Sequence, residues 1–324
     1  MKKKTLAIIG ATGLVGQTFL HILEEHNEDF ELKLFASKKS EGKKLFVNNK
    51  SYIVHKLTND SFKNIDYALF FTDASVSSIY IPKAIENNVK VIDNSSHFRM
   101  NDEVKLIAYG ANEDLIDHND NLISNPNCAV IQSIVPLYTL KSFGIKEISY
   151  NTYQSVSGSG KKGIDDLLRC RKGFVPLFYE TDISFTCIPK IGELNKDGFT
   201  SEEQKMIDET RKILIDHSID ISATCIRVPV MFSHGVSVEV KLKEKFTVEN
   251  IIDCFKNNSN IVVCDNILPT SILSCKSDKI YVGRIRKKHD RLLFYCVADN
   301  VRVGAASNAY NILKHMIKLG EQNG

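Results

Sequence analysis

Three features that would assign the chain of 324 residues to a special class are missing: a long hydrophobic run, a large net charge and paired cysteines. No stretch approaches the roughly 18 consecutive apolar residues of a membrane span. The basic start leads into only a short run, Thr5 to Ile9, before a glycine, which predicts a first strand and not a signal peptide. The net charge of +3 gives no indication of nucleic-acid binding. We therefore expect a cytoplasmic protein with neither membrane nor nucleic-acid partners.

The eight cysteines form no CxxC pair and do not cluster with histidines at the spacing of a metal site. We therefore expect no bound metal. Most of the cysteines are expected to be reduced, buried, small apolar residues. Only Cys128 has a local sequence context that indicates chemistry.

The length and the composition, 43% apolar and 25% charged, are typical of an ordinary globular protein with two domains. In the N-terminal third, short apolar runs alternate with helical patterns. Strands separated by helices predict parallel pairing through right-handed crossovers, which is the doubly wound, Rossmann-type α/β sheet. The predicted strands cover residues 6–9, 32–35, 67–71 and 89–92, and the predicted helices cover about 15–25 and 76–87.

From about Ser149 the pattern changes to alternating polar and apolar residues, as in 149–153 and 236–242. A period of two predicts a largely antiparallel sheet with one covered face, and hence a second domain of α+β type. Helices are predicted at 201–216, 248–256 and 305–318. We place the first domain at 1–127, joined by the C-terminal helix 305–324, and the second at 128–304.

The glycine-rich segment GATGLVG, residues 10–16, lies between the first predicted strand and the first predicted helix. This is the context that a dinucleotide-binding fingerprint requires, because glycines let the backbone approach a pyrophosphate whose charge the helix N-terminus stabilises. The spacing is GxxGxxG and not GxGxxG, so a glycine-rich turn without a ligand is the alternative. The candidate cofactor-binding residues here are Gly10, Thr12, Gly13, Leu14, Val15 and Gly16.

The end of the second strand bears on the choice of nicotinamide cofactor. An acid at this position accepts hydrogen bonds from the ribose 2′-hydroxyl of NAD and would repel a 2′-phosphate. Here the segment has two hydroxyls and two lysines, which favour a phosphate and therefore NADP. A solvated lysine pair in a loop is the alternative. The candidate contacts are Ser37, Lys39 and Ser40.

Asn125-Pro126-Asn127-Cys128 leads directly into an apolar helical pattern. Asn127 is a natural N-cap, which places Cys128 in the first helical turn. Unpaired amides and the helix dipole lower the pKa of a thiol at such a position and favour the nucleophilic thiolate. A buried structural cysteine is the alternative.

Together with residues 10–16 and the segment QSVSG at 154–158, this motif resembles the aspartate-β-semialdehyde dehydrogenase family. Further matching motifs follow in order at 95–100, 202–205, 227–234 and 299–308. The resemblance covers nearly the whole chain and implies an NADPH-dependent enzyme that reduces L-aspartyl-4-phosphate to L-aspartate-4-semialdehyde through a cysteine thioester. It also implies a role in the pathway to lysine, threonine, methionine and diaminopimelate, and assembly as a homodimer or homotetramer.

By this resemblance Cys128 is the nucleophile, His234 is the acid/base and Gln154 positions the acyl group. The chemistry agrees with these residue types, because a thioester or thiohemiacetal needs a proton relay and donors to the developing oxyanion. Taken alone, His234 would more often be a structural or solvated histidine. The resemblance also implies four more cofactor contacts: Thr72, Ser157, Gly158 and Asn308.

The same resemblance implies a site for each charged group of the substrate. Arg99 and Lys205 match the phosphate contacts, with Asn127 as a neutral donor. Arg227 matches the arginine that binds the α-carboxylate as a planar fork, and Glu202 matches the group that receives the amine. Glu202 and Lys205 are three residues apart on a predicted helix, so a plain surface pair is the alternative.

The chain departs from the family pattern at a few positions. Lys39 stands where many relatives have arginine, His97 where alanine is usual and Ser159 where alanine is frequent. Lysine offers a point charge and not a fork, which weakens the inference about cofactor selectivity. The segment 163–200 is short, which puts in doubt a helical insertion that some relatives use for subunit contacts.

Two other functions compete with this interpretation. N-acetyl-glutamyl-phosphate reductase shares the architecture and the chemistry, but its nucleophile follows Asn-Pro-Gly, whereas Asn127 precedes Cys128 here. A catalytically silent NADP-binding homologue is the second, since a fold does not guarantee activity. Such proteins typically lose the nucleophile or its base, and this chain has both.

Overall fold

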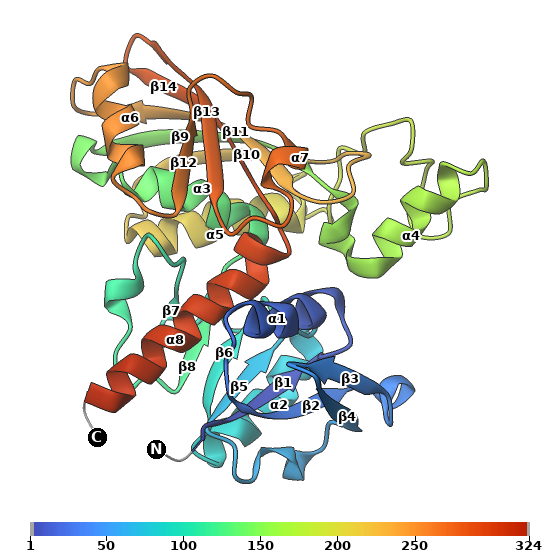
Figure 1. Cartoon of the computed structure of the whole chain (residues 1–324). Coiled ribbons are helices and arrows are strands. Elements are labelled where there is room, and N and C mark those ends of the chain that lie inside the picture. The colour runs from blue at the N-terminus through green and yellow to red at the C-terminus, as the bar shows by residue number, and fades with distance from the viewer. Residues whose placement is uncertain (1–2, 323–324) are drawn as a thin grey trace. The chain divides into compact units, whose positions relative to one another are not determined.

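The structure is a computed structural model that describes residues 3–322. The chain forms two compact units (Figure 1). The first unit contains the chain up to Pro126 together with the C-terminal segment from Ala305, and the second unit runs from Asn127 to Gly304. The first boundary lies one residue before the position expected from the sequence.

The first unit contains an eight-stranded sheet in the order β3-β4-β2-β1-β5-β6-β8-β7. Every pairing is parallel except that of β3 with β4, so the predicted doubly wound sheet is confirmed. The sequence did not predict the β3–β4 hairpin or the short strands β7 and β8. The strands are β1 (Thr5–Ile9), β2 (Glu31–Ala36), β3 (Lys44–Val47), β4 (Lys50–Lys56), β5 (Tyr67–Phe70), β6 (Lys90–Asp93), β7 (Lys105–Leu106) and β8 (Leu122–Ser124).

Helices cover both faces of this sheet, and successive side chains of β1 point into two different hydrophobic cores. Leu6 and Ile8 pack in one core with α1 and α8, whereas Ala7 and Ile9 pack in the other with α2. The C-terminal helix α8 packs against α1 and β6 of this unit. The helices of this unit are α1 (Leu14–Glu25), α2 (Ala74–Glu86) and α8 (Ser307–Gln322), with short turns η1 (Lys38–Ser40), η2 (Asn59–Phe62) and η3 (Glu113–Leu115).

The second unit contains a six-stranded sheet in the order β10-β9-β11-β14-β13-β12. Its three central pairings are antiparallel, which confirms the prediction of a largely antiparallel sheet, and both outer strands pair in parallel. Parallel pairing of β10 with β9 brings the carboxyl ends of both strands to one edge. The strands are β9 (Ile145–Gln154), β10 (Asp220–Arg227), β11 (His234–Leu242), β12 (Ile261–Cys264), β13 (Ile280–Lys288) and β14 (Arg291–Ala298).

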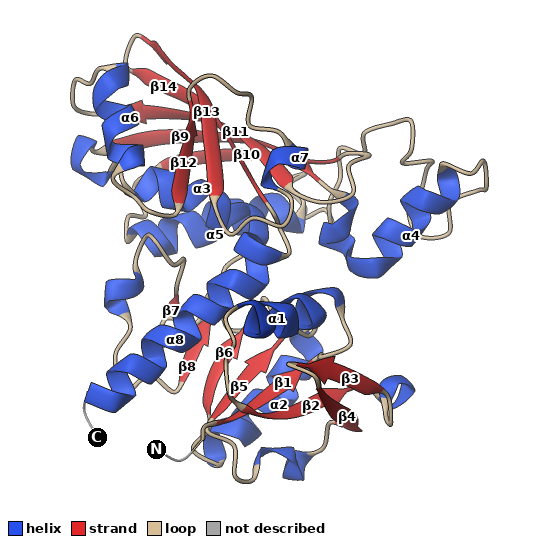
Figure 2. Ribbon diagram, in the orientation of Figure 1, coloured by secondary structure: helices blue, strands red, loops and turns tan. Residues whose placement is uncertain are grey.

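Two helices of the second unit bear on the site, because α3 packs on β11 and β14 while α5 packs on β10 and on α3. Around α4, an arm extends away from the sheet (Figure 2) and exposes Phe174, Leu177 and Phe185. The helices are α3 (Cys128–Tyr138), α4 (Gly160–Cys170), α5 (Ser201–Leu214), α6 (Val248–Lys256) and α7 (Ser271–Ser274), with short turns η4 (Lys141–Phe143) and η5 (Val156–Ser159), and the π-helical turn η6 (Arg302–Ala306) precedes α8.

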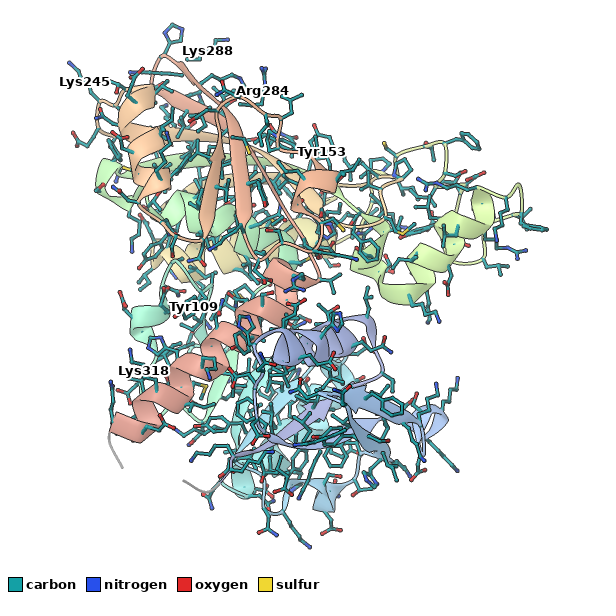
Figure 3. The ribbon with its side chains drawn as sticks, viewed as in Figure 1. Tyr109, Tyr153, Lys245, Arg284, Lys288 and Lys318 are labelled. Atoms are coloured by element: carbon teal, nitrogen blue, oxygen red, sulfur yellow. The ribbon has the colours of Figure 1, made fainter. Side chains whose placement is uncertain are left out.

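No helix within residues 3–322 is long and apolar enough to cross a membrane. Figure 3 shows the side chains of both units, with Lys318 and Tyr109 labelled in the first unit and Lys245 and Lys288 in the second. Tyr153, at the end of β9, remains 40% exposed on the sheet of the second unit.

Candidate active site

The nucleophile candidate occupies the first position of helix α3. The side chain of Asn127 caps α3, because its Oδ1 accepts hydrogen bonds from the amides of Ala129 (2.9 Å) and Val130 (3.4 Å). The predicted N-cap is therefore confirmed, and Cys128 is the first helical residue. The backbone amide of Asn127 donates to the buried Glu209 carboxylate at 2.6 Å, which ties the start of α3 to α5.

At least two of the other cysteines, Cys225 and Cys296, are poor nucleophiles. All eight are free, and four of them are buried, fewer than the sequence suggested. Burial raises the pKa of Cys225 and of Cys296 to about 12, so these thiols stay protonated at neutral pH. Cys128 is partly exposed, which agrees with a residue that must meet a substrate.

Glu202 joins three other predicted site residues. Its Oε1 accepts hydrogen bonds from Asn127 Nδ2 (2.9 Å) and Gln154 Nε2 (3.2 Å), and its Oε2 lies 3.2 Å from the ammonium of Lys205. Burial raises the pKa of Glu202, but Lys205, the two amides and Arg227 outweigh burial and lower it below its ordinary value. Glu202 is therefore a carboxylate at neutral pH and not a member of a plain surface pair.

The strand register brings the other candidates to the same edge of the sheet. Gln154 ends β9 and lies opposite Arg227, which ends β10. His234 begins β11, where its neighbour Gly235 lies opposite Tyr153 of β9. Arg227 is buried and its Nη1 donates to the carbonyl of Ser155 at 2.7 Å.

His234 is fully buried, and its ring is oriented by one neighbour. The backbone amide of Ser155 donates to Nδ1 at 3.0 Å, and Gln132 Nε2 donates to the His234 carbonyl at 2.9 Å. Burial, reinforced by the charge of Arg227, lowers the pKa of His234 to about 3. The ring is consequently neutral at physiological pH.

Two glycines allow backbone to pass close to these groups. A Cβ at Gly158 would lie 2.6 Å from Arg227 Nη1 and 3.1 Å from His234 Nε2. A Cβ at Gly304 would lie 2.6 Å from the Cβ of Cys128. Any larger residue at either position would displace a proposed catalytic or binding side chain. Ser157 and Gly158 are both predicted cofactor contacts. They belong to the second unit, where Gly158 lies next to the His234 ring.

The glycine loop of the first unit fits a pyrophosphate. Gly10 has φ of +85°, and a Cβ there would lie 2.2 Å from the carbonyl oxygen of Phe71. The N-cap of α1 is Gly13, which has no side chain to accept hydrogen bonds from the first-turn amides. These amides are therefore available to an anion at the N-terminus of α1. Leu14 and Val15 supply the first turn of that helix.

The other predicted cofactor contacts of the first unit lie after β2 and after β5. Ser40 Oγ lies 3.2 Å from Thr12 Oγ1, so two predicted cofactor residues from separate segments meet, and Ser37 and Lys39 are exposed beside them. Thr72 lies just after β5, with its Oγ1 3.4 Å from Ser77 Oγ.

Arg99 and Asn308, the remaining site candidates of the first unit, are both buried. Arg99 Nη2 donates to the carbonyl of Asn94 at 2.8 Å. The amide of Asn308 is used within the fold, because it donates to Ile107 and Asn125 and accepts from the amide of Tyr109.

Sequence reasoning missed several residues that hold the site. Glu209, Gln132 and Ser155 are buried and hydrogen-bonded to Asn127 or His234. Asn300 accepts three hydrogen bonds from residues around His234. Ser155 and Asn300 lie within motifs that support the family resemblance, and that was the available signal; Glu209 and Gln132 gave none.

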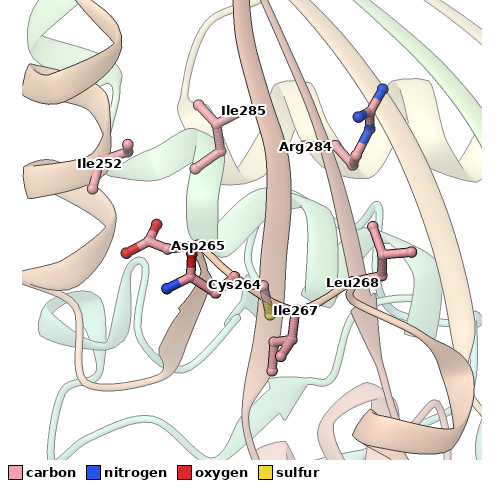
Figure 4. A pocket seen from close by; sticks show the side chains of 8 residues that line it. Ile252, Cys264, Asp265, Ile267, Leu268, Arg284 and Ile285 are labelled. Atoms are coloured by element: carbon pink, nitrogen blue, oxygen red, sulfur yellow. The ribbon is translucent and has the colours of Figure 1, made fainter.

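A pocket of about 420 Å³ lies elsewhere in the second unit, between β12, β13 and α6 (Figure 4). Ile252, Leu268 and Arg284 contribute to its lining, which includes none of the predicted site residues. Within residues 3–322, no group of three histidine, cysteine or acidic side chains is arranged to hold a metal ion.

Two family models match the chain. The semialdehyde dehydrogenase NAD binding domain matches residues 5–119, and the semialdehyde dehydrogenase dimerisation domain matches residues 134–303. The fold and the site therefore define a semialdehyde dehydrogenase.

Individual relatives narrow this class. The chain is 41% identical to aspartate-semialdehyde dehydrogenase of Aquifex aeolicus, over 97% of this chain and 98% of that protein. It is 37% identical to aspartate-semialdehyde dehydrogenase 2 of Vibrio cholerae, over 97% of each. The crystal structure of aspartate semialdehyde dehydrogenase II of V. cholerae complexed with ASA superposes with a TM-score of 0.94 at 36% identity, over 98% of this chain and 99% of that chain. The chain belongs to the aspartate-semialdehyde dehydrogenase family, as its motifs indicated.

Proposed function

We propose that the protein catalyses the NADPH-dependent reductive dephosphorylation of L-aspartyl-4-phosphate to L-aspartate-4-semialdehyde, in the pathway to lysine, threonine, methionine and diaminopimelate. The observation that carries this proposal is that one unit contains Cys128 at the start of α3, the Glu202 carboxylate bonded to the Asn127 cap of that helix, and the neutral ring of His234. Membership of the family gives the reaction class, and the relative complexed with ASA supports the substrate.

In the proposed reaction the Cys128 thiolate attacks the acyl carbon and inorganic phosphate leaves, which forms a thioester. NADPH, when bound, supplies a hydride to that carbonyl carbon. The resulting oxyanion collapses, the C–S bond breaks and the aldehyde leaves with the thiolate regenerated. Gln154 positions the acyl group. His234, proposed as the acid/base group, serves the carbonyl oxygen, where a developing negative charge needs a donor.

The charged residues of the site complement the three ionic groups of the substrate. Glu202 keeps its charge in spite of burial, which suits an ammonium group. Arg227 offers a planar fork to the α-carboxylate. Lys205 and Arg99 are proposed to bind the phosphate, with the amide of Asn127 as a neutral donor.

NADP is the proposed cofactor because the segment after β2 contains hydroxyls and lysines and no acid before Glu41. The glycine loop and the first-turn amides of α1 would hold the pyrophosphate, and Lys39 with Ser37 and Ser40 would face the 2′-phosphate. A homodimer or homotetramer is proposed because the second family model is a dimerisation domain.

The test is phosphate-dependent reduction of NADP with aspartate semialdehyde. We expect turnover that requires inorganic phosphate or arsenate and disappears after the thiol of Cys128 is alkylated. A parallel assay uses N-acetyl-glutamate semialdehyde, the substrate of the competing reductase. Faster turnover of that compound would overturn the substrate assignment, and no turnover of either would support a silent homologue.

A further inference from the structure

Asn300 connects two segments that flank His234. It is 4% exposed, and its Oδ1 accepts hydrogen bonds from Ser157 Oγ (2.9 Å), Ser155 Oγ (3.1 Å) and the backbone amide of Ser233 (2.9 Å). The two serines follow β9, and Ser233 directly precedes β11. A single amide oxygen therefore links the segment after β9 to the residue before His234.

The segment before His234 requires such a partner because its conformation is unfavourable. Ser233 has φ of +72°, in the left-handed region that costs an L-residue about 1–2 kcal/mol. Its amide is directed at Asn300, and this hydrogen bond stabilises the turn that begins β11 at His234. The orientation of the imidazole depends on this turn.

The hydrogen bond between Ser155 and the ring defines where the imidazole proton lies. A backbone N–H can only donate, so Nδ1, 3.0 Å from the Ser155 amide, must accept. In the neutral ring the proton is then on Nε2. Nε2 is the ring nitrogen next to Gly158, and the guanidinium of Arg227 lies beside the same glycine.

We propose that Asn300 is a positioning residue that, by holding Ser155, Ser157 and Ser233, fixes His234 as the Nε2–H tautomer and directs this N–H at the carbonyl oxygen of the substrate. This inference deepens the proposed function and rests on it. In this role the imidazole donates a hydrogen bond to the oxyanion when the hydride adds, and that bond weakens when the C–S bond breaks. No net proton transfer is required, because the oxygen regains its double bond to carbon as the thiolate leaves.

The neutral state of the ring agrees with this assignment. Burial and the charge of Arg227 keep the pKa of His234 far below physiological pH. The charge of Glu202 and a hydrogen bond with the backbone of Ser233 act in the opposite direction, and burial outweighs both. A neutral Nε2–H is a weaker acid than an imidazolium, so in the hydride step it acts on the carbonyl oxygen by donating a hydrogen bond.

The tautomer can be observed directly in the full-length protein with ¹⁵N-labelled histidine. Two-bond ¹H–¹⁵N correlation spectra distinguish a protonated Nε2 from a protonated Nδ1, and the spectrum of His234→Gln identifies the signals. We expect His234 to be Nε2–H in the wild type. Asn300→Ala should release Ser155 and populate the Nδ1–H tautomer, and kcat should fall about 10- to 100-fold with little change in the KM for aspartate semialdehyde.

Two further variants distinguish a loss of His234 positioning from a general loss of protein stability. Asn300→Asp keeps an acceptor oxygen at the same place, so it should retain the Nε2–H tautomer and recover part of the decrease in kcat. Asn112→Ala is the matched control: Asn112 is a buried asparagine of the first unit whose amide bridges Leu106 and Ala108. This control should leave the His234 tautomer unchanged even where it lowers stability. If Asn300→Ala does not fold, Asn300→Ser, which is too short to hold both serines, takes its place.

The outcomes distinguish this inference from the proposed function. An unchanged tautomer and unchanged kcat in Asn300→Ala would overturn the role of Asn300 while the enzyme assignment stands. Activity retained in His234→Gln would instead overturn the proposed role of His234. The spectra need no turnover, so the tautomer can be determined even if aspartate semialdehyde is not a substrate.

Discussion

The glycine loop of the first unit and the proposed catalytic cluster of the second unit (Glu202, Lys205, Arg227 and His234) are both proposed to bind anions, but the first would use backbone and the second side chains. The loop offers backbone amides at the start of α1, where Gly13 leaves the first turn uncapped. The cluster offers side chains on α5, β10 and β11, and Asn127 caps the first turn of α3. One site therefore depends on the absence of side chains, and the other on their mutual hydrogen bonds.

This difference determines what each site tolerates. Backbone amides carry no net charge, so the loop needs only steric freedom, as the close approach of Gly10 to Phe71 shows. The cluster contains Glu202, Lys205 and Arg227 around a neutral His234. Glu202, Arg227 and His234 are buried, so removing one of them leaves its partners unsatisfied, which costs more than the interaction itself.

The largest expected effect is that of Cys128→Ser. An alcohol of high pKa cannot replace the thiolate, so turnover should fall by at least about a thousandfold, roughly 4 kcal/mol of barrier. NADP affinity should be nearly unchanged because the glycine loop is not altered. Steady-state kinetics and cofactor titration measure the two quantities. Cys187→Ser, at an exposed cysteine, is the control, and activity of Cys128→Ser within about tenfold of wild type would exclude Cys128 as the nucleophile.

The second prediction separates the two arginines. Arg227→Lys keeps the charge and removes the fork, so it should weaken aspartate semialdehyde binding and leave the saturation curve for inorganic phosphate largely intact. Arg99→Lys should do the reverse. Removing a bidentate charged interaction from a dry site costs about 2–3 kcal/mol, on the order of 30- to 150-fold in KM. Equal effects of each substitution on both substrates would contradict separate anion sites.

The local motifs were the part of this arrangement that the sequence could predict. A helix cap and a glycine turn depend on neighbours in the chain, so Asn127, Cys128 and residues 10–16 were recognisable as candidates. Asn300 and Ser155, by contrast, are 145 residues apart, and Asn127 and Glu209 are 82 apart. Such pairs depend on the strand order of a mixed sheet, which periodicity alone does not define.

The third prediction tests the steric requirement of the loop. Gly10→Ala places a methyl group 2.2 Å from the Phe71 carbonyl at a φ of +85°, so the loop must shift. We expect NADP binding to weaken about tenfold or more and the free energy of unfolding to fall by about 1–3 kcal/mol. Isothermal titration and urea unfolding provide the measurements.

Gly42→Ala is the matched control for this change. Gly42 has a similar φ of +78°, but a Cβ there meets no atom within 4 Å. It should incur only the backbone cost of about 1 kcal/mol and leave NADP affinity unchanged. Equal decreases of affinity in both variants would show that strain, and not the close approach to Phe71, limits the loop.

The smallest expected effect concerns Lys39, an exposed residue beside Ser40, whose hydroxyl lies near Thr12. Lys39→Glu should raise the KM for NADPH about tenfold and change that for NADH far less, because only NADPH has a 2′-phosphate to repel. The effect should shrink as ionic strength rises, since exposed charges are screened. Lys38→Glu adds the same charge one residue away and should have a smaller effect. If Lys39→Glu raised both Michaelis constants equally, Lys39 would be a solvated surface charge, and the preference for NADP would have to come from Ser37, Ser40 or the loop itself.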